Sequence, residues 1–106
     1  MNRLVELLSK YTLDTGNFSI EYNRHKNYYC TDPNDIASEY LGQGASKKQI
    51  KEFLQSIDVT KPIYCITWYP LTPVGFYTFF DNSIDNLIKD IEETIKRDNL
   101  YENSSI

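Results

Sequence analysis

Residues 62–97 constrain the fold most, because they carry three consecutive elements with clear boundaries. Two aromatic-rich segments, residues 62–69 and 74–80, are separated by a segment that begins with Pro70 and ends with Pro73. The first segment has apolar residues at both alternating positions, as an internal strand does, and the prolines interrupt strand pairing. An apolar stripe with helical spacing follows: Ile84, Leu87, Ile88, Ile91 and Ile95. The sequence therefore predicts two paired strands and then an amphipathic helix.

The first part of the chain follows a similar plan. Apolar side chains recur with helical spacing over residues 2–11, which predicts a first amphipathic helix. Phe18, Ile20 and Tyr22 alternate with polar residues, the pattern of a half-buried strand. The polar residues 24–27 then predict a turn, and residues 28–31 supply a return strand. We therefore expect a hairpin here as well.

Two further helices have recognisable ends. Asp32 can cap a helix that has Pro33 at its first position, and Gly42 can end that helix in the left-handed αL conformation. Ser46 and Gln49 have the spacing of a capping box, which predicts a helix from there to about Asp58.

The predicted order is αββα followed by αββα. It indicates a small single α+β domain over residues 1–99, with a four-stranded, mostly antiparallel sheet packed by helices. Residues 100–106 are short and polar, and we expect them to fray. Residues 29–41 can be aligned with residues 79–91, since both pass from an aromatic strand end through an Asp/Asn cap to an apolar helix. Internal duplication and independent convergence on the same junction chemistry both explain this likeness.

Charge and composition exclude several classes of protein. The net charge is −4, and residues 81–106 carry all of it, since they contain seven acids and three bases. Such a chain is not suited to binding a phosphate backbone directly. No run of apolar residues is long enough for a membrane span, and the first residues do not have the pattern of a secretory signal. Two cysteines without metal-ligand spacing indicate free thiols in a cytoplasmic protein, with no metal and no cofactor.

The candidate catalytic residues have simpler structural explanations. His25 lies between Arg24 and Lys26 in the predicted turn, where we expect it to be solvated and its pKa to be depressed by its basic neighbours. Cys30 and Cys65 fall inside predicted strands, where cysteine behaves as a small hydrophobe. Because acid–base and nucleophilic chemistry need positioned partners, we assign no catalytic residue and expect a protein that is not an enzyme.

The loop over residues 42–48 superficially resembles a phosphate-binding loop, because it combines two glycines, a serine and two lysines before a helix. It follows a helix instead of a strand, and it does not have the spacing of a nucleotide-binding P-loop. A helix C-cap followed by an N-cap explains each of its residues.

Two segments are candidates for partner binding. The aromatic segment around the proline-bounded loop would lose little entropy on docking, which favours a protein interface. The last helix adds an acidic face. Each has a structural alternative: Trp68 could belong to the core, and the helix acids could be compensated by i,i+4 pairs, namely Asp85–Lys89, Glu92–Lys96 and Glu93–Arg97. The candidate contact residues are Trp68, Tyr69, Leu71, Phe76, Tyr77, Asp85, Asp90 and Glu93.

The first functional hypothesis is a small acidic binding protein that inhibits or neutralises a protein partner. A phage-encoded inhibitor of host defence, such as an anti-CRISPR protein, or an immunity protein against a toxin fits this description. The alternative is a small-molecule or nucleotide-binding domain whose pocket lies between sheet and helices, lined by His25, Cys30 and residues 42–46. A third hypothesis is self-association as a homodimer through a sheet edge.

Overall fold

A three-stranded antiparallel sheet forms the centre of the molecule. The computed structural model describes residues 2–12, 18–70 and 75–100. The strands are β1 (Phe18–Tyr22), β2 (Tyr64–Trp68) and β3 (Tyr77–Asp81), in the order β1-β2-β3. Four α-helices, α1 (Asn2–Lys10), α2 (Pro33–Leu41), α3 (Lys47–Ser56) and α4 (Ile84–Asp98), complete a small α+β domain.

The register of the sheet separates two chemically different faces. Ile20, Ile66 and Phe79 are aligned across the three strands and belong to the apolar face. Because side chains alternate along a strand, the neighbouring positions point to the opposite face. There the aligned rows are Ser19–Thr67–Thr78 and Glu21–Cys65–Phe80.

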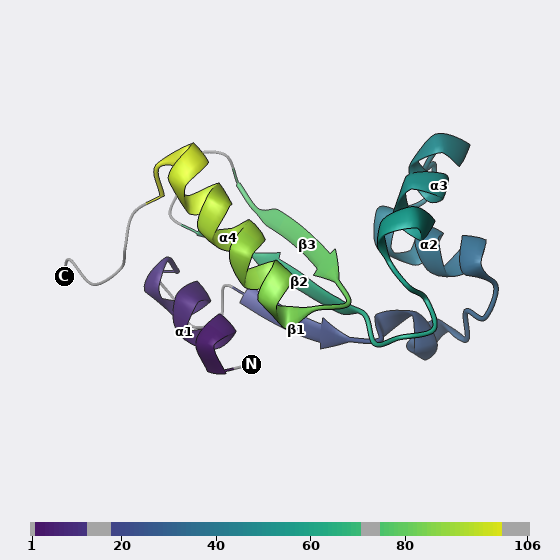
Figure 1. Cartoon of the computed structure of the whole chain (residues 1–106), viewed down its shortest axis with the longest axis horizontal. Coiled ribbons are helices and arrows are strands. Elements are labelled where there is room, and N and C mark those ends of the chain that lie inside the picture. Colours follow the sequence, from purple (N-terminus) through teal and green to yellow (C-terminus); the bar gives the residue numbers. More distant parts are fainter. Residues whose placement is uncertain (1, 13–17, 71–74, 101–106) are drawn as a thin grey trace.

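The apolar face is covered by α1 and α4, which lie side by side across the sheet (Figure 1). Leu4 and Leu8 of α1 and Leu87 and Ile91 of α4 are fully buried with Trp68. The Trp68 indole Nε1 donates a hydrogen bond to Thr12 Oγ1 at 3.0 Å, and that hydroxyl donates to Leu8 O at 2.7 Å. The one polar atom of the large ring is therefore satisfied, as burial of tryptophan requires.

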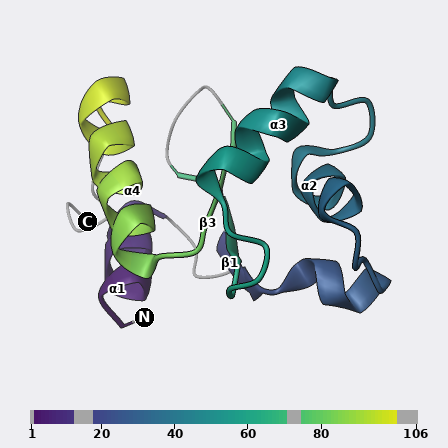
Figure 2. The same cartoon turned by 45° about the vertical axis from the view of Figure 1, so that its right-hand side comes forward.

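The second helix pair lies beyond the Cys65–Phe80 end of the sheet and packs on the face opposite to α1 and α4 there (Figure 1). Figure 2 shows β1 and β3 between α1–α4 on the left and α2–α3 on the right. Tyr40 of α2 and Phe53 of α3 contact Phe80 of β3, with ring centroids 6.0 and 5.3 Å from the Phe80 ring. Ile63 and Cys65 are buried in the same cluster. This small second core covers only the Cys65–Phe80 end of the face.

The predicted helix N-caps are confirmed. Asp32 Oδ1 accepts a hydrogen bond from Asn34 N at 2.8 Å at the start of α2. Gly42 follows α2 with a positive φ of 93°, but its ψ of 163° lies outside the αL conformation that was predicted for it. Ser46 and Gln49 form both hydrogen bonds of the capping box at the start of α3. Ser83 is the residue that caps α4.

The predicted return strand over residues 28–31 is wrong, and the sheet formed by the described residues has three strands instead of four. A 3₁₀ helix, η1 (Arg24–Tyr28), replaces the tight turn. Asn23 and Tyr29 bound it with φ angles of 51° and 56°, and Asn23 also exchanges two hydrogen bonds with the backbone of Ile63. The chain is thereby led away from the sheet towards α2. The first half of the chain is therefore not αββα, so the two halves do not share one order of elements.

Leu100 was expected in the frayed tail, but it is buried in the core below α1 and α4, and its backbone N–H donates to Ile95 O at 3.1 Å. Residues 101–106 lie outside the described residues. None of the described helices is long and apolar enough to cross a bilayer.

Candidate partner-binding surface

Two of the predicted aromatic contact residues lie together on the surface. Tyr69 directly follows β2 and Phe76 directly precedes β3, and their ring centroids are 5.4 Å apart. Their exposed fractions are 47% and 58%. Trp68 was named in the same set but is completely buried, so the core alternative is correct for this residue. Leu71 lies outside the described residues.

The exposed aromatic pair adjoins the uncovered part of the sheet. Since Trp68 is paired with Tyr77, continuing the antiparallel register places Tyr69 opposite Phe76. Alternation then puts both rings on the side that α1 and α4 do not cover. The next row on that side is Ser19, Thr67 and Thr78, of which Ser19 and Thr78 are exposed. We call these five residues the open sheet face: Ser19, Thr67, Tyr69, Phe76 and Thr78.

Tyr77, also predicted to contact a partner, belongs mainly to the other side. Its ring is half-buried with its centroid 5.6 Å from that of Trp68, and its hydroxyl donates a hydrogen bond to Asp98 Oδ2. The hydrogen bonds from Arg97 and Tyr77 lower the pKa of Asp98. Tyr77 therefore connects β3 to the end of α4 and is structural in this arrangement.

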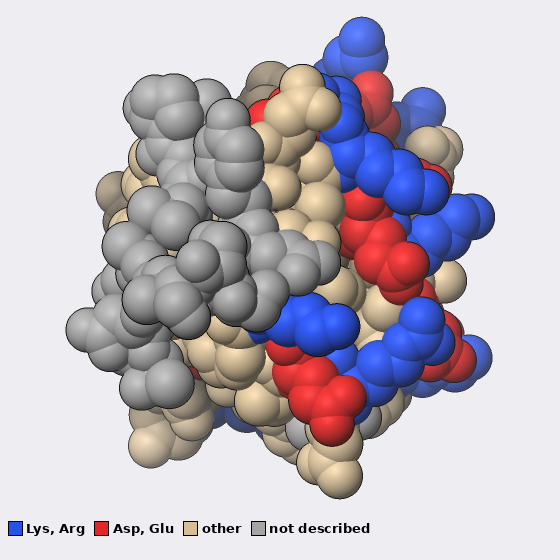
Figure 3. All heavy atoms as spheres, turned by 90° about the vertical axis from the view of Figure 1, so that its left-hand side faces the viewer, with Lys and Arg blue, Asp and Glu red and all other residues tan. Residues whose placement is uncertain are grey.

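The acidic side chains of α4 that were predicted to contact a partner are exposed, but the charge pairing differs from the prediction. Asp85, Asp90 and Glu93 all face solvent. Within the described residues, the ion pairs of α4 are Arg3–Glu92 at 3.4 Å and Arg97–Asp98 at 3.1 Å, and the three expected i,i+4 pairs do not form. Figure 3 shows basic and acidic side chains interleaved on the side of the molecule that it presents.

A small acidic cluster lies between the end of β3 and the first half and middle of α4. Asp81, Asp90 and Glu93 line a hollow of about 270 Å³ together with Asn86 and Lys89. Burial, Asp81 and Glu93 raise the pKa of Asp90, in that order of importance. No group of three or more side chains suited to a metal ion occurs among the described residues.

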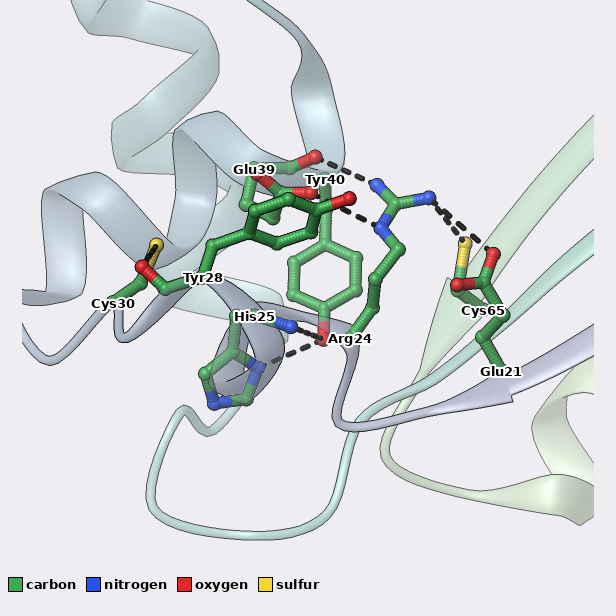
Figure 4. A network of polar contacts seen from close by, with 8 residues as sticks. All are labelled: Glu21, Arg24, His25, Tyr28, Cys30, Glu39, Tyr40 and Cys65. Atoms are coloured by element: carbon green, nitrogen blue, oxygen red, sulfur yellow. Dashed lines mark hydrogen bonds and ion pairs between the residues drawn. The ribbon is translucent and has the colours of Figure 1, made fainter.

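A polar network centred on Arg24 attaches α2 to the sheet (Figure 4). Arg24 Nη2 donates to Glu39 O at 2.7 Å, and Nη1 lies 3.8 Å from both Cys65 Sγ and Glu21 Oε1. Arg24 Nε lies 3.3 Å from Glu39 Oε1, an ion pair without hydrogen-bond geometry. The guanidinium carbon is 5.2 Å from the centre of the Tyr40 ring, so a cation–π contact completes the network.

His25 is buried, which corrects the expectation of a solvated turn residue. The first residues of η1 carry its ring into the interior, where Nδ1 lies 2.8 Å from the Tyr40 hydroxyl. The same hydroxyl accepts from the His25 backbone N–H at 3.4 Å, and its own O–H can donate to Nδ1 in the tautomer that carries the ring proton on Nε2. Burial and then Lys26 lower the pKa of His25, which keeps the imidazole neutral.

Neither cysteine thiol forms a catalytic pair with His25 among the described residues. Cys65 is buried in β2 as predicted, and burial raises its pKa. Cys30 was expected in a strand, but it follows η1 in irregular structure and is half-buried. No hydrogen bond joins the imidazole of His25 to either thiol among the described residues. Gly42 and Gly44, part of the expected pocket lining, are exposed on the surface.

Sequence reasoning missed the role of Arg24, since its partners Glu39 and Cys65 are distant along the chain. The signal that was present is the scarcity of arginine: Arg24 is one of three. Arginine is suited to a site where several acceptors and an aromatic ring converge.

Comparison of the chain with protein families, with curated proteins and with solved structures gives no match in any of the three.

Proposed function

We propose that the chain is a small acidic, non-enzymatic binding protein that docks on a protein partner through the open sheet face and thereby inhibits or neutralises it. The observation that carries this proposal is the exposed pair Tyr69–Phe76 beside an uncovered polar row of the sheet. The partner classes that fit are an effector of host defence, as for an anti-CRISPR protein, and a toxin, as for an immunity protein.

The two rings support an interface because they have the features of a hot spot. Large aromatic side chains dominate binding energy where they are brought out of water at the centre of an interface. Tyr69 and Phe76 already contact each other, so part of their side-chain freedom is lost before docking. Both are also attached directly to strands of the sheet, since Tyr69 follows the last residue of β2 and Phe76 precedes the first residue of β3.

The rest of the open sheet face supplies complementary chemistry. Ser19 and Thr78 present hydroxyl groups that can donate and accept hydrogen bonds. An interface with an aromatic centre and such polar neighbours resembles the usual division into an apolar core and a polar rim. The exposed acids of α4, Asp85, Asp90 and Glu93, would contribute to steering a basic partner towards the protein.

The test combines capture with an inhibition assay. The immobilised chain is exposed to bacterial lysates, and the captured protein is identified, purified and assayed with and without the chain. We expect stoichiometric capture and inhibition. The double variant Tyr69→Ser/Phe76→Ser should weaken binding at least about 30-fold, the effect of losing one hot-spot residue of about 2 kcal/mol.

The matched control removes two exposed rings at the other end of the sheet. Tyr28 and Tyr29 are 62% and 90% exposed, and the variant Tyr28→Ser/Tyr29→Asn should bind as the original chain does. Asparagine is chosen at position 29 because it tolerates the positive φ. Equal loss of binding in both double variants, failure to capture a stoichiometric protein, or full activity of the saturated partner would each overturn the proposal. Capture of the chain by itself would favour the homodimer instead.

A further inference from the structure

A second surface, on the outer side of α3, has a different chemistry from the open sheet face. α2 and α3 pack against each other and leave a groove of about 670 Å³ along α3. Its lining comes mainly from one stripe of α3, with Asn34 of α2 at the side. The α3 residues that line it are Lys47, Ile50, Lys51, Leu54 and Gln55.

The spacing of these residues makes the groove suitable for a helix. They stand at positions i, i+3, i+4, i+7 and i+8, so they lie on one face of α3. Ile50 and Leu54 pack partly against the second core and remain half-buried, which leaves part of each side chain open to a ligand. A groove of this kind, beside a helix and with apolar residues one turn apart, can receive the apolar stripe of another helix.

The charges that line the groove favour an acidic ligand. Lys47 and Lys51 lie one turn apart on its lining, and no carboxylate of the described residues lies within ion-pair distance of either. The capped start of α3 at Ser46 adds the positive end of a helix dipole beside Lys47. The residues that line the groove therefore include two basic side chains and no acidic one, in a protein whose net charge is −4.

We propose that the α3 groove binds an acidic amphipathic helix of a partner protein. Its apolar residues would cover Ile50 and Leu54, and its carboxylates would pair with Lys47 and Lys51. This site is distinct from Tyr69 and Phe76, and the inference does not depend on the function proposed for the open sheet face.

The probe is a synthetic 18-residue peptide that forms an acidic amphipathic helix of Glu, Ala and Leu. Binding is followed by titration of the ¹⁵N-labelled chain, with amide shifts as the readout. We expect saturable shifts confined to Asn34 and to the groove side of α3. The shifts of Ser19, Thr67 and Thr78 should stay unchanged.

Matched variants on the same helix separate groove binding from bulk attraction. Lys47→Glu should weaken binding at least about 10-fold, while Lys48→Glu, which makes the same change of charge at a neighbouring lysine outside the groove lining, should change it less than about threefold. Folding is not expected to confound this comparison, because an acid near a helix N-terminus is favourable. Tyr69→Ser/Phe76→Ser should bind the peptide normally, so the two proposed surfaces can fail independently.

Two control ligands complete the experiment. A peptide of the same composition with a scrambled apolar stripe should bind at least about 10-fold more weakly, because it cannot cover Ile50 and Leu54 while pairing with the lysines. Vesicles containing half anionic lipid should not bind. Equal binding of the scrambled peptide, equal loss in Lys48→Glu, shifts outside the groove, or binding of vesicles but not of the helix would overturn the proposal.

Discussion

The two cores on either side of the sheet differ in how they are held together. The core beneath α1 and α4 is almost wholly apolar, with Trp68 and Ile66 sealed from solvent. The core beneath α2 and α3 is smaller and includes a polar network in which Arg24, His25 and Tyr40 replace part of the apolar packing. The first core also extends further along the sheet: it includes Trp68 and Tyr77 as well as Ile66 and Phe79, whereas the second core reaches only Cys65 and Phe80.

The comparison also shows which aromatic rings are packed in a core and which remain exposed. On the α1–α4 side, Tyr77 and Phe79 pack against Trp68 and contribute to stability. On the other side, α2 and α3 reach only the Cys65–Phe80 end, which leaves Tyr69 and Phe76 without a covering helix. The larger apolar core and the proposed binding surface thus lie on opposite faces of the same two strands.

The largest expected effect tests the apolar core. Trp68→Ala removes a fully buried indole and should lower the free energy of unfolding by about 4 kcal/mol, a loss that can unfold a domain of this size. Urea denaturation followed by circular dichroism measures it. Trp68→Phe retains most of the ring but loses the bond to Thr12, and it should cost about 1–2 kcal/mol. A native-like midpoint for Trp68→Ala would contradict the packing of this core.

A smaller effect is expected from the polar core. Arg24→Met should lower the free energy of unfolding by about 2 kcal/mol. It leaves the Glu39 backbone carbonyl without its hydrogen-bond donor and the Glu39 carboxylate without its ion-pair partner. Arg3→Met provides the control, since Arg3 pairs with Glu92 on the exposed surface and its side chain is 74% exposed; its loss should cost less than about 0.5 kcal/mol. Urea midpoints of both variants test the contrast. Equal effects would mean that the Arg24 network does not hold α2 to the sheet.

The pH dependence of stability sharpens the same contrast. Because the folded-state pKa of His25 is below its unfolded value of 6.5, the unfolded state binds more protons between these two values. The contribution of His25 is therefore fully present above pH 6.5 and is lost as the pH falls towards the folded-state pKa. His25→Gln can still accept from Tyr40 but does not titrate. The loss of stability between pH 7.5 and 5 should be smaller in this variant, and an unchanged pH profile would contradict a neutral buried imidazole.

The smallest effect is expected on the open sheet face. Tyr69→Ser/Phe76→Ser should change the free energy of unfolding by less than about 1 kcal/mol, because both side chains are about half exposed or more. Thermal unfolding measures this. A loss comparable with that of Trp68→Ala would show that the pair is structural and not a docking surface.

The sequence correctly predicted the helix starts and the strand that depend on local chemistry. Asp32 and Pro33 begin α2, and Ser46 with Gln49 begins α3, because caps and first-turn residues act within one turn of the chain. The alternation at Phe18, Ile20 and Tyr22 also identified β1. These features need no knowledge of distant partners.

The predictions that were wrong concern features that depend on contacts between residues distant in the sequence. The polar run after Asn23 has the composition of a turn, but the burial of His25 against Tyr40, 15 residues away, makes it a 3₁₀ helix. Trp68 and Tyr69 are adjacent and both aromatic, so composition could not tell which one lies under α1 and α4. Their alternation assigns opposite faces, but only the positions of the helices decide which face is covered.

Hydroxyl-radical footprinting of the free chain, read by mass spectrometry, tests most directly whether stability and binding occupy opposite faces of β2 and β3. The structure predicts rapid labelling of Tyr69 and Phe76 and strong protection of the adjacent Trp68. With the captured partner present, Tyr69 and Phe76 should become protected while Tyr29 remains reactive. Rapid labelling of Trp68, or protection of Tyr69 and Phe76 in the free chain, would contradict the account.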